Sequence, residues 1–314
     1  MNFTTTLISV ALLIVMAVPG YALKKAKLLG ENAAAPLVAV LMYVAQPILI
    51  IASFFRKSYE PRLLANMGWV LLFTTLFLFM GYGIARLVFS RRRDENGLTM
   101  SARACIAGST LSNCSFMGIP VLQALFPDNP EPIIYSAVFN IPFQIFCWTI
   151  AVYTVSGERR HISLKNALLN PPTLALVVAL PVFFAGLTVP DEIMNTLDFL
   201  GNMTTPLSMI VMGIRLAEMS PKELFGAGEV YVACALRLVV IPLAAFGILL
   251  LVEQLLPIDT LVVASMYVMT AMPTAASTML FAERFGGDTR TAVKCMLLSS
   301  ILCVVTIPLL LLLL

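Results

Sequence analysis

Residues 109–120 have the sequence Ser109-Thr110-Leu111-Ser112-Asn113-Cys114-Ser115-Phe116-Met117-Gly118-Ile119-Pro120, in which small polar side chains, a glycine and a proline interrupt a hydrophobic stretch. Pro120 donates no backbone hydrogen bond, and Gly118 tolerates unusual dihedrals, so we expect the helix to break or kink between residues 113 and 120. Backbone groups freed inside a membrane must bond to neighbouring helices, to water or to a ligand. The stretch therefore predicts a broken membrane helix with polar groups at its centre.

A second interruption lies 159 residues further along the chain, where Met272-Pro273-Thr274-Ala275-Ala276-Ser277 stands in the middle of another hydrophobic stretch. The same offset carries Pro47 and Arg56 onto Pro206 and Arg215. Paired interruptions at corresponding places in two halves of a membrane protein indicate the substrate site of a carrier. Two inverted broken helices would direct the partial positive charge of their N-termini to one point, which favours a carboxylate.

The composition indicates a membrane protein, because 60% of the 314 residues are hydrophobic and only 12% are charged. A membrane-spanning helix needs about 20 apolar residues. The chain has ten such stretches, at residues 3–23, 33–55, 63–89, 101–125, 131–156, 168–188, 193–215, 226–252, 259–284 and 290–313. In the first of them the lysines follow the apolar run, so we expect a retained helix and not a cleaved signal.

Basic residues predict the orientation of these stretches. Most of the 20 Lys and Arg residues lie in the odd-numbered connectors, and basic connectors stay in the cytoplasm. Both termini should therefore lie on the extracytoplasmic side of a plasma membrane, the bacterial inner membrane. The basic character of the chain is explained by connectors beside anionic lipid headgroups, and no nucleic-acid partner is indicated.

An odd number of spans in each half makes the predicted repeat inverted. We expect a single all-α integral membrane domain over residues 1–314, with a first five-helix repeat over 1–158 and a second, inverted one over 159–314. The boundary lies in a short basic connector that lacks the Ser, Gly or Pro run of a flexible linker. Helices 4 and 9 of this arrangement would be the broken, crossing pair.

Other polar residues in the apolar stretches are candidates for the same cavity. Gln46 precedes Pro47, and Asn140 and Gln144 share one helical face beside Pro142. Each of these has an alternative role, either shaping a helix at the proline or hydrogen-bonding helix to helix. The predicted substrate-binding residues are Gln46, Asn113, Gly118, Pro120, Asn140, Gln144, Pro273, Thr274 and Ser277.

Arg237 lies near the middle of the eighth stretch, where an arginine is costly unless it faces a partner or water. Two roles remain open from the sequence. The first is a counter-charge for a transported anion. The second is a structural tie to backbone carbonyls or to an acid near a helix end, such as Asp198.

Several chemistries lack their residues in this sequence. No Asp or Glu lies in the middle of an apolar stretch, which argues against an acidic proton relay, and no phosphate-binding loop of the G-x-x-x-x-G-K-[ST] type is present. The six cysteines fall in apolar stretches with no C-x-x-C pair, so we expect neither disulfides nor a metal site. We expect no cofactor and no enzymatic activity.

Three motifs carry a resemblance to a known family, and the similarity extends over the whole chain. They are Ser112-Asn113-Cys114-Ser115-Phe116-Met117-Gly118-Ile119-Pro120, Thr205-Pro206-Leu207-Ser208-Met209-Ile210-Val211-Met212-Gly213-Ile214-Arg215-Leu216 and Ala271-Met272-Pro273-Thr274-Ala275-Ala276-Ser277. With them the chain resembles the auxin efflux carrier family, whose bacterial members include malonate and malate carriers. The resemblance implies a scaffold similar to that of the sodium/proton antiporters and bile-acid symporters.

The resemblance also implies that the substrate carboxylate lies near the crossover, held in part by the asparagine at Asn113. Family members often have a second asparagine where this chain has Ser277, so a symmetric pair of amides is not expected here. The leading hypothesis is a secondary carrier of a small organic anion, such as malonate, malate or an auxin-like acid, that works by alternating access. Its coupling ion, H+ or Na+, and its oligomeric state, a homodimer included, stay open.

Two other functions are consistent with the sequence. One is a sodium-coupled organic-anion symporter of the bile-acid type, in which backbone carbonyls and hydroxyls at the crossover bind sodium. The other is a membrane receptor that binds a ligand without moving it. The short connectors leave no room for a signalling domain, which makes the receptor the weaker alternative.

Overall fold

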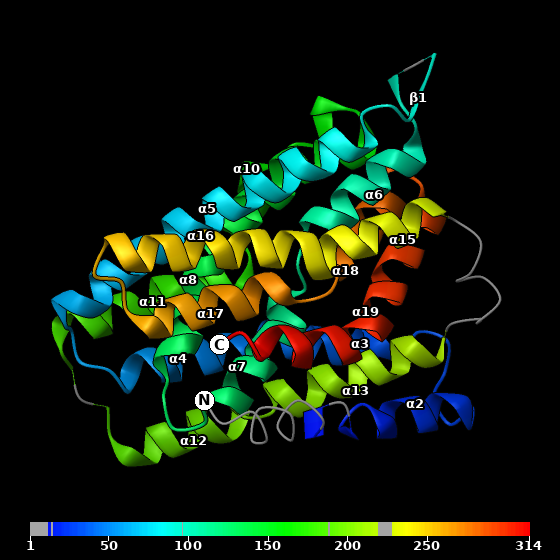
Figure 1. The fold of residues 1–314 in the computed structure, drawn as a ribbon. Coiled ribbons are helices and arrows are strands. Elements are labelled where there is room, and N and C mark those ends of the chain that lie inside the picture. Colours follow the sequence, from blue (N-terminus) through cyan, green and yellow to red (C-terminus); the bar gives the residue numbers. More distant parts are fainter. Residues whose placement is uncertain (1–11, 14, 96, 188, 219–227) are drawn as a thin grey trace. The chain divides into compact units, whose positions relative to one another are not determined.

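The computed structural model describes residues 12–13, 15–95, 97–187, 189–218 and 228–314, and helices dominate this part of the chain (Figure 1). The elements up to residue 125 are α2 (Val18–Lys25), α3 (Ala34–Val40), η1 (Leu41–Ala45), α4 (Gln46–Phe55), α5 (Pro61–Phe89), β1 (Arg93–Asp94), β2 (Gly97–Leu98), α6 (Met100–Thr110), η2 (Cys114–Gly118) and α7 (Ile119–Leu125). Those from residue 131 to 217 are α8 (Glu131–Phe146), η3 (Cys147–Ala151), α9 (Val152–Ser156), η4 (Arg159–His161), α10 (Leu164–Leu168), α11 (Pro171–Ala185), α12 (Asp191–Gly201) and α13 (Thr204–Ala217).

The last elements are α15 (Gly228–Ala235), η5 (Leu236–Val240), α16 (Ile241–Leu255), α17 (Thr260–Ala271), α18 (Ala276–Phe285) and α19 (Thr289–Leu311). Six helical segments in the described residues are long and apolar enough to cross a membrane: Ala34–Phe55, Pro61–Phe89, Glu131–Ser156, Arg159–Ala185, Gly228–Leu255 and Thr289–Leu311. Each predicted stretch from residue 33 onward coincides with one helix or with consecutive helices. About half of the first stretch, residues 3–11 and 14, lies outside the described residues, and its end contains most of α2. The count of ten spans stays a prediction.

The chain forms two compact units that alternate along the sequence. Unit 1 contains residues 1–70, 115–140 and 169–219, and unit 2 contains residues 71–114, 141–168 and 220–314. Each unit therefore takes segments from both predicted halves. The inverted repeat itself is not tested by this division and stays a prediction.

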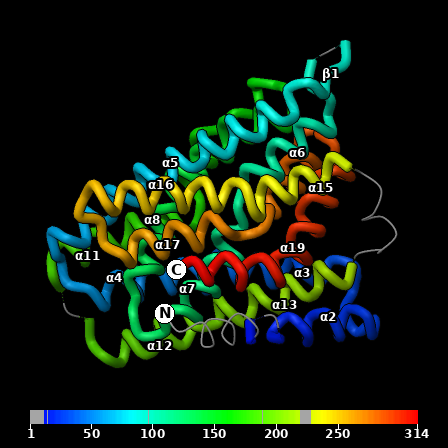
Figure 2. Tube along the Cα trace, in the orientation of Figure 1, coloured from blue at the N-terminus to red at the C-terminus, as the bar shows by residue number. Residues whose placement is uncertain are grey.

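Unit 1 contains an extensive helix contact between α2 and α13 (Figure 1). A β-carbon added to Gly20 would lie 2.2 Å from the Ile210 carbonyl oxygen, and one added to Gly213 would lie 1.9 Å from that of Ala17. Glycine at both positions lets the two backbones touch, which is the usual way that small residues bring membrane helices together. The tube in Figure 2 shows the two helices side by side over their length.

Three π-helical segments share one feature, a proline two residues after their last residue. Segment η1 precedes Pro47, η2 precedes Pro120 and η5 precedes Pro242, and each proline lies in the first turn of the following α-helix. Proline lacks the N–H that would bond four residues back, and its ring crowds that carbonyl. The wider π turn relieves the conflict without ending the helix. At Gln46-Pro47 the chain therefore stays helical.

The connector after α5 contains a short antiparallel hairpin, which is not predicted from the sequence. Strand β1 pairs with β2 through Arg93 opposite Leu98 and Asp94 opposite Gly97. Gly97 has a φ of +109°, a left-handed conformation that favours glycine. In unit 2 the hairpin leads into α6, which packs against α15, α19 and α9.

Candidate functional site at the crossover in unit 2

Two interrupted helices meet inside unit 2 through their extended residues. Helix α6 ends at Thr110 and α17 at Ala271, and both are followed by extended backbone. Ser112 pairs with Thr274 as an isolated antiparallel bridge. The N–H of Asn113 donates to the Pro273 carbonyl at 2.7 Å, and the N–H of Ala275 donates to the Leu111 carbonyl at 2.9 Å. The freed backbone groups of the two breaks thus satisfy each other.

The break in the first stretch begins earlier than the sequence predicts. Its extended residues are 111–113, and residues 114–118 already form the π-helical segment η2. Pro120 does not mark the break, because it follows η2, whose wider π turn accommodates the proline without ending the helix. In the second stretch the interruption between α17 and α18 lies at the predicted residues.

Thr274 fixes the crossing from the second stretch. It is buried, its hydroxyl donates to the Gly108 carbonyl at 2.8 Å, and its N–H donates to the Ser299 hydroxyl at 3.0 Å. Gly108 belongs to the last turn of α6, where helix carbonyls have no partner within their own helix. In this structure the Thr274 hydroxyl is therefore bound to the protein, and its predicted role toward a substrate remains a prediction.

The remaining carbonyls at the end of α6 bind Arg237. Its Nη1 donates to the Thr110 carbonyl at 2.8 Å and to the Ser109 carbonyl at 3.3 Å, and its Nη2 donates to the Thr270 carbonyl in the last turn of α17. One guanidinium thus joins the C-terminal ends of both interrupted helices. Arg237 is only 1% exposed.

Arg237 reaches this position from the π-helical segment η5 of the eighth stretch. Its described polar contacts are with backbone carbonyls, which is the geometry of the structural tie considered from the sequence. The suggested acid, Asp198, pairs instead with Arg56 inside unit 1. A role for Arg237 as a counter-charge for a bound anion stays a prediction.

Asn113 presents an unused carboxamide at the crossover. Its backbone is held by Pro273, its side chain is half-buried, and the carboxamide has no hydrogen-bond partner among the described residues. A carboxamide offers two donors and an acceptor. These groups are available for hydrogen bonds, and the substrate-binding role of Asn113 stays a prediction.

Helix α18 begins directly after the second break and adds further donors. Its N-cap residue, Ala275, provides no side-chain cap, so the first amides of the helix lack that partner. The Thr278 hydroxyl is fully buried without a described hydrogen-bond partner, and the Ser277 hydroxyl lies beside the Cys147 thiol. Uncapped amides with the positive end of the helix dipole favour an anion.

The other predicted site residues divide between the two units. Gln144 belongs to unit 2, whereas Gln46, Gly118, Pro120 and Asn140 belong to unit 1.

Within unit 1, Asn140 is fully buried, and its carboxamide is bound on both sides. It donates to the Ser136 carbonyl at 2.9 Å and accepts from the Ser115 hydroxyl at 3.0 Å. The bond from Ser115 joins η2 to α8, which is the helix-to-helix role considered from the sequence, and a substrate role for Asn140 stays a prediction. The Gln46 amide nitrogen, in contrast, is buried with no described partner.

Two residues of the crossover are not predicted from the sequence. Ser299 lies in α19 and accepts the hydrogen bond of the Thr274 amide, and Thr278 lies in the first turn of α18. For Ser299, the available signal in the sequence is the pair Ser299-Ser300 inside an apolar stretch. Its partner Thr274 comes from another helix, and such a contact cannot be recognised from the sequence.

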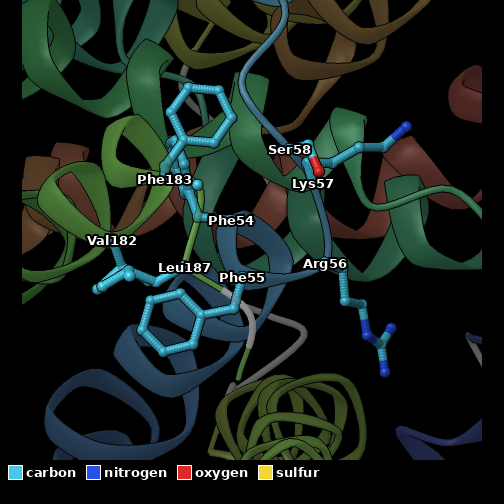
Figure 3. A pocket seen from close by; sticks show the side chains of 9 residues that line it. Phe54, Phe55, Arg56, Lys57, Ser58, Val182, Phe183 and Leu187 are labelled. Carbon is cyan, nitrogen blue, oxygen red and sulfur yellow. The ribbon is translucent and has the colours of Figure 1, made fainter. Parts of the chain in front are cut away.

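A small pocket of roughly 70 Å³ also exists in unit 1, between the ends of α4 and α11 (Figure 3). Phe54, Phe55 and Phe183 gather on one side of it, while the side chains of Arg56 and Lys57 extend away from these rings. The two cations are already paired with Asp198 and Glu131. The pocket therefore offers no free charge for an anion.

Comparison with known proteins identifies the family. The profile described as "Membrane transport protein" matches residues 5–163 and 159–311, which together cover almost the entire chain. The chain belongs to this family. It is the auxin efflux carrier family to which the three sequence motifs pointed.

Relatives of similar length support the assignment. An uncharacterized transporter of Methanothermobacter thermautotrophicus is 26% identical over 315 residues, which cover 98% of this chain and 97% of the relative. An uncharacterized transporter of Methanocaldococcus jannaschii is 26% identical over 89% of both chains. The uncharacterized transporter YfdV of Escherichia coli K12 is 25% identical over 95% of this chain and 94% of its own. The family and these names describe membrane transporters and not enzymes.

Proposed function

We propose that this family member is a secondary active transporter that moves a small organic anion across the membrane by alternating access. The substrate class is a carboxylate, with malonate and malate as the first candidates and an auxin-like acid as a further one. The family supports transport in general. The crossover in unit 2 supports the choice of a carboxylate.

The observation that carries this proposal is the free carboxamide of Asn113 at the point where two membrane helices break and bond to each other. Polar groups inside a membrane are costly and are normally bonded. The backbone around Asn113 follows that rule, because its N–H is bonded to Pro273. The carboxamide does not follow it within the described residues, which is consistent with a position kept for a ligand.

The preference for an anion rests on α18. Its uncapped N-terminus and the hydroxyls of Ser277 and Thr278 lie in the segment that follows the bonded residues 273–275. Helix N-termini bind carboxylates through their free amides and the helix dipole. No Asp or Glu of this chain lies mid-stretch to repel such a substrate.

We further propose an inner-membrane location with both termini on the extracytoplasmic side, supported by the basic odd-numbered connectors. The protein works without a cofactor in this proposal, and its coupling ion is H+ or Na+. A homodimer is the oligomeric form we would examine first. A sodium-coupled symporter of the bile-acid type is the alternative, since unwound carbonyls can bind sodium.

Binding of labelled malonate and malate to the purified protein tests the site. Replacing Asn113 with Ala removes a hydrogen bond to a charged group worth about 1.5–3 kcal/mol, so affinity should fall roughly 10- to 100-fold. Asn113→Asp, nearly identical in shape, should weaken binding further because it places a negative charge beside the substrate. Asn202→Ala, an exposed residue between α12 and α13, is the control and should bind normally.

The thermal unfolding midpoint of each variant separates binding from folding. Unchanged affinity in Asn113→Ala, with the wild-type midpoint, would remove this residue from the site. Equal losses in Asn113→Ala and Asn202→Ala would indicate a general effect on the protein.

A further inference from the structure

We propose that Arg237 is the resident cation of the crossover, occupying with its guanidinium the position that a sodium ion bound by helix-end carbonyls would need. The consequence for ion coupling rests on the proposed transport function. The structural assignment itself does not, and it is tested without a substrate. The observations behind it are the hydrogen bonds accepted by the carbonyls at the ends of α6 and α17.

The last four carbonyls of a helix lack partners within the helix, and all four of α6 have partners here. The Ala107 carbonyl accepts from the Leu111 N–H at 2.9 Å, and the Gly108 carbonyl accepts from the Thr274 hydroxyl. The carbonyls of Ser109 and Thr110 both accept from Arg237. Each of the four carbonyls therefore already has a donor from the protein.

The end of the second interrupted helix, α17, also binds the Arg237 guanidinium. Thr270, in the last turn of α17, gives its carbonyl to Nη2 of Arg237. Helix C-termini carry partial negative charge, and here two of them end around one guanidinium. Unwound carbonyls and half-helix C-terminal ends are the groups that bind sodium in transporters with broken helices. The fork of an arginine satisfies several carbonyls at once and keeps its charge when buried.

The surroundings of Arg237 agree with this assignment. The side chain is 1% exposed, and no carboxylate of the described chain forms an ion pair with it. A buried charge needs compensation. The carbonyls of the two helix ends provide the compensation at Nη1 and Nη2, whereas the buried Nε has no hydrogen-bond partner among the described residues.

Arg237 contacts both helix ends from the π-helical segment η5 of the eighth stretch. Arg237 is the second residue of η5, five residues before Pro242. A π turn shifts the residues that follow it around the helix axis, and such turns are frequent at functional sites. If Arg237 replaces a bound cation, coupling to sodium through these carbonyls is absent and a proton gradient becomes the driving force to examine.

Thermal unfolding of the full-length protein in detergent tests the assignment. A thiol-reactive dye is a suitable probe, because all six cysteines are free and buried. The wild type should give the same midpoint in sodium and choline chloride. Arg237→Ala opens a cavity lined by carbonyls and should lower the midpoint by roughly 5–10 °C. About 10 mM guanidinium, far below denaturing concentrations, should restore part of the loss, whereas choline should not.

Two further variants complete the design. Arg284→Ala removes an exposed arginine of the same unit and should show neither loss nor rescue. Arg237→Lys keeps the charge but not the fork, so its midpoint should lie between those of wild type and Arg237→Ala. It replaces Arg237→Ala if that variant does not fold.

Two results would overturn the assignment. The first is a wild-type midpoint that rises in sodium relative to choline, which would show that a sodium site remains. The second is an Arg237→Ala protein that unfolds like the wild type, or that guanidinium does not rescue. Because malonate is absent from these measurements, a wrong substrate class would leave both outcomes unchanged.

Discussion

At the scale of single residues, the crossover depends on a few hydrogen bonds that cap helix ends from outside the helix. Thr274 is the clearest case, because its buried hydroxyl donates to the Gly108 carbonyl in the last turn of α6. Arg237 donates to backbone carbonyls at the ends of both α6 and α17. Polar groups buried in a membrane protein are costly when unpaired, so these residues have little freedom to change.

Thr274→Val tests the residue scale with a change that preserves shape. It removes the donor to the Gly108 carbonyl and leaves that carbonyl buried, which should cost about 1–3 kcal/mol. Thr75→Val is a matched control, because Thr75 is exposed and its hydroxyl bonds to Leu71 four residues earlier in the same helix. Thermal midpoints should fall for Thr274→Val and hardly move for Thr75→Val. Equal midpoints would show that the tie to Gly108 does not support the crossing.

The sequence predicted part of this residue-level picture. Pro273 and the polar run around Asn113 indicated both interruptions, because proline and small polar residues in an apolar stretch are readable without a structure. The roles of Arg237 stayed open, since carbonyl partners leave no mark in a sequence. Ser299 was missed for the same reason, because its partner Thr274 comes from a different helix.

At the scale of elements, glycine and proline determine how the helices run and approach one another. The sequence predicts a helix break or kink at residues 113–120, yet Pro120, like Pro47 and Pro242, lies in the first turn of an α-helix that follows a π-helical segment. The wider π turn before each proline accommodates the missing N–H and the ring. The sequence alone does not predict these π turns. Glycine allows the contact of α2 with α13.

Gly213→Ala tests the element scale. The added carbon would lie 1.9 Å from the Ala17 carbonyl oxygen, so α2 and α13 must move apart and their other contacts must weaken. Overpacking of this kind typically costs about 1–3 kcal/mol, seen as a lower thermal midpoint. Gly83→Ala is the control, because a carbon added there meets nothing within 4 Å. A stable Gly213→Ala protein would show that the helices approach less closely than described.

At the scale of the whole molecule, the two compact units do not follow the two predicted halves. Residues 169–219 of unit 1 correspond, at the offset of 159, to residues 10–60 of the same unit. The membrane class could be predicted from composition, and the repeat that relates these segments stays a prediction. The sequence did not indicate how those segments are distributed between units, because that depends on packing between distant parts of the chain.

The central claim concerns the whole molecule and is tested most directly by transport. Wild-type protein and Asn113→Ala would be reconstituted in proteoliposomes, and uptake of labelled malonate and malate measured with a sodium gradient, with a pH gradient and with neither. We predict uptake by the wild type under a pH gradient, no further increase with sodium, and a loss of roughly 10-fold or more in Asn113→Ala. Absence of uptake under every gradient by correctly folded protein, or equal uptake by Asn113→Ala, would contradict the account.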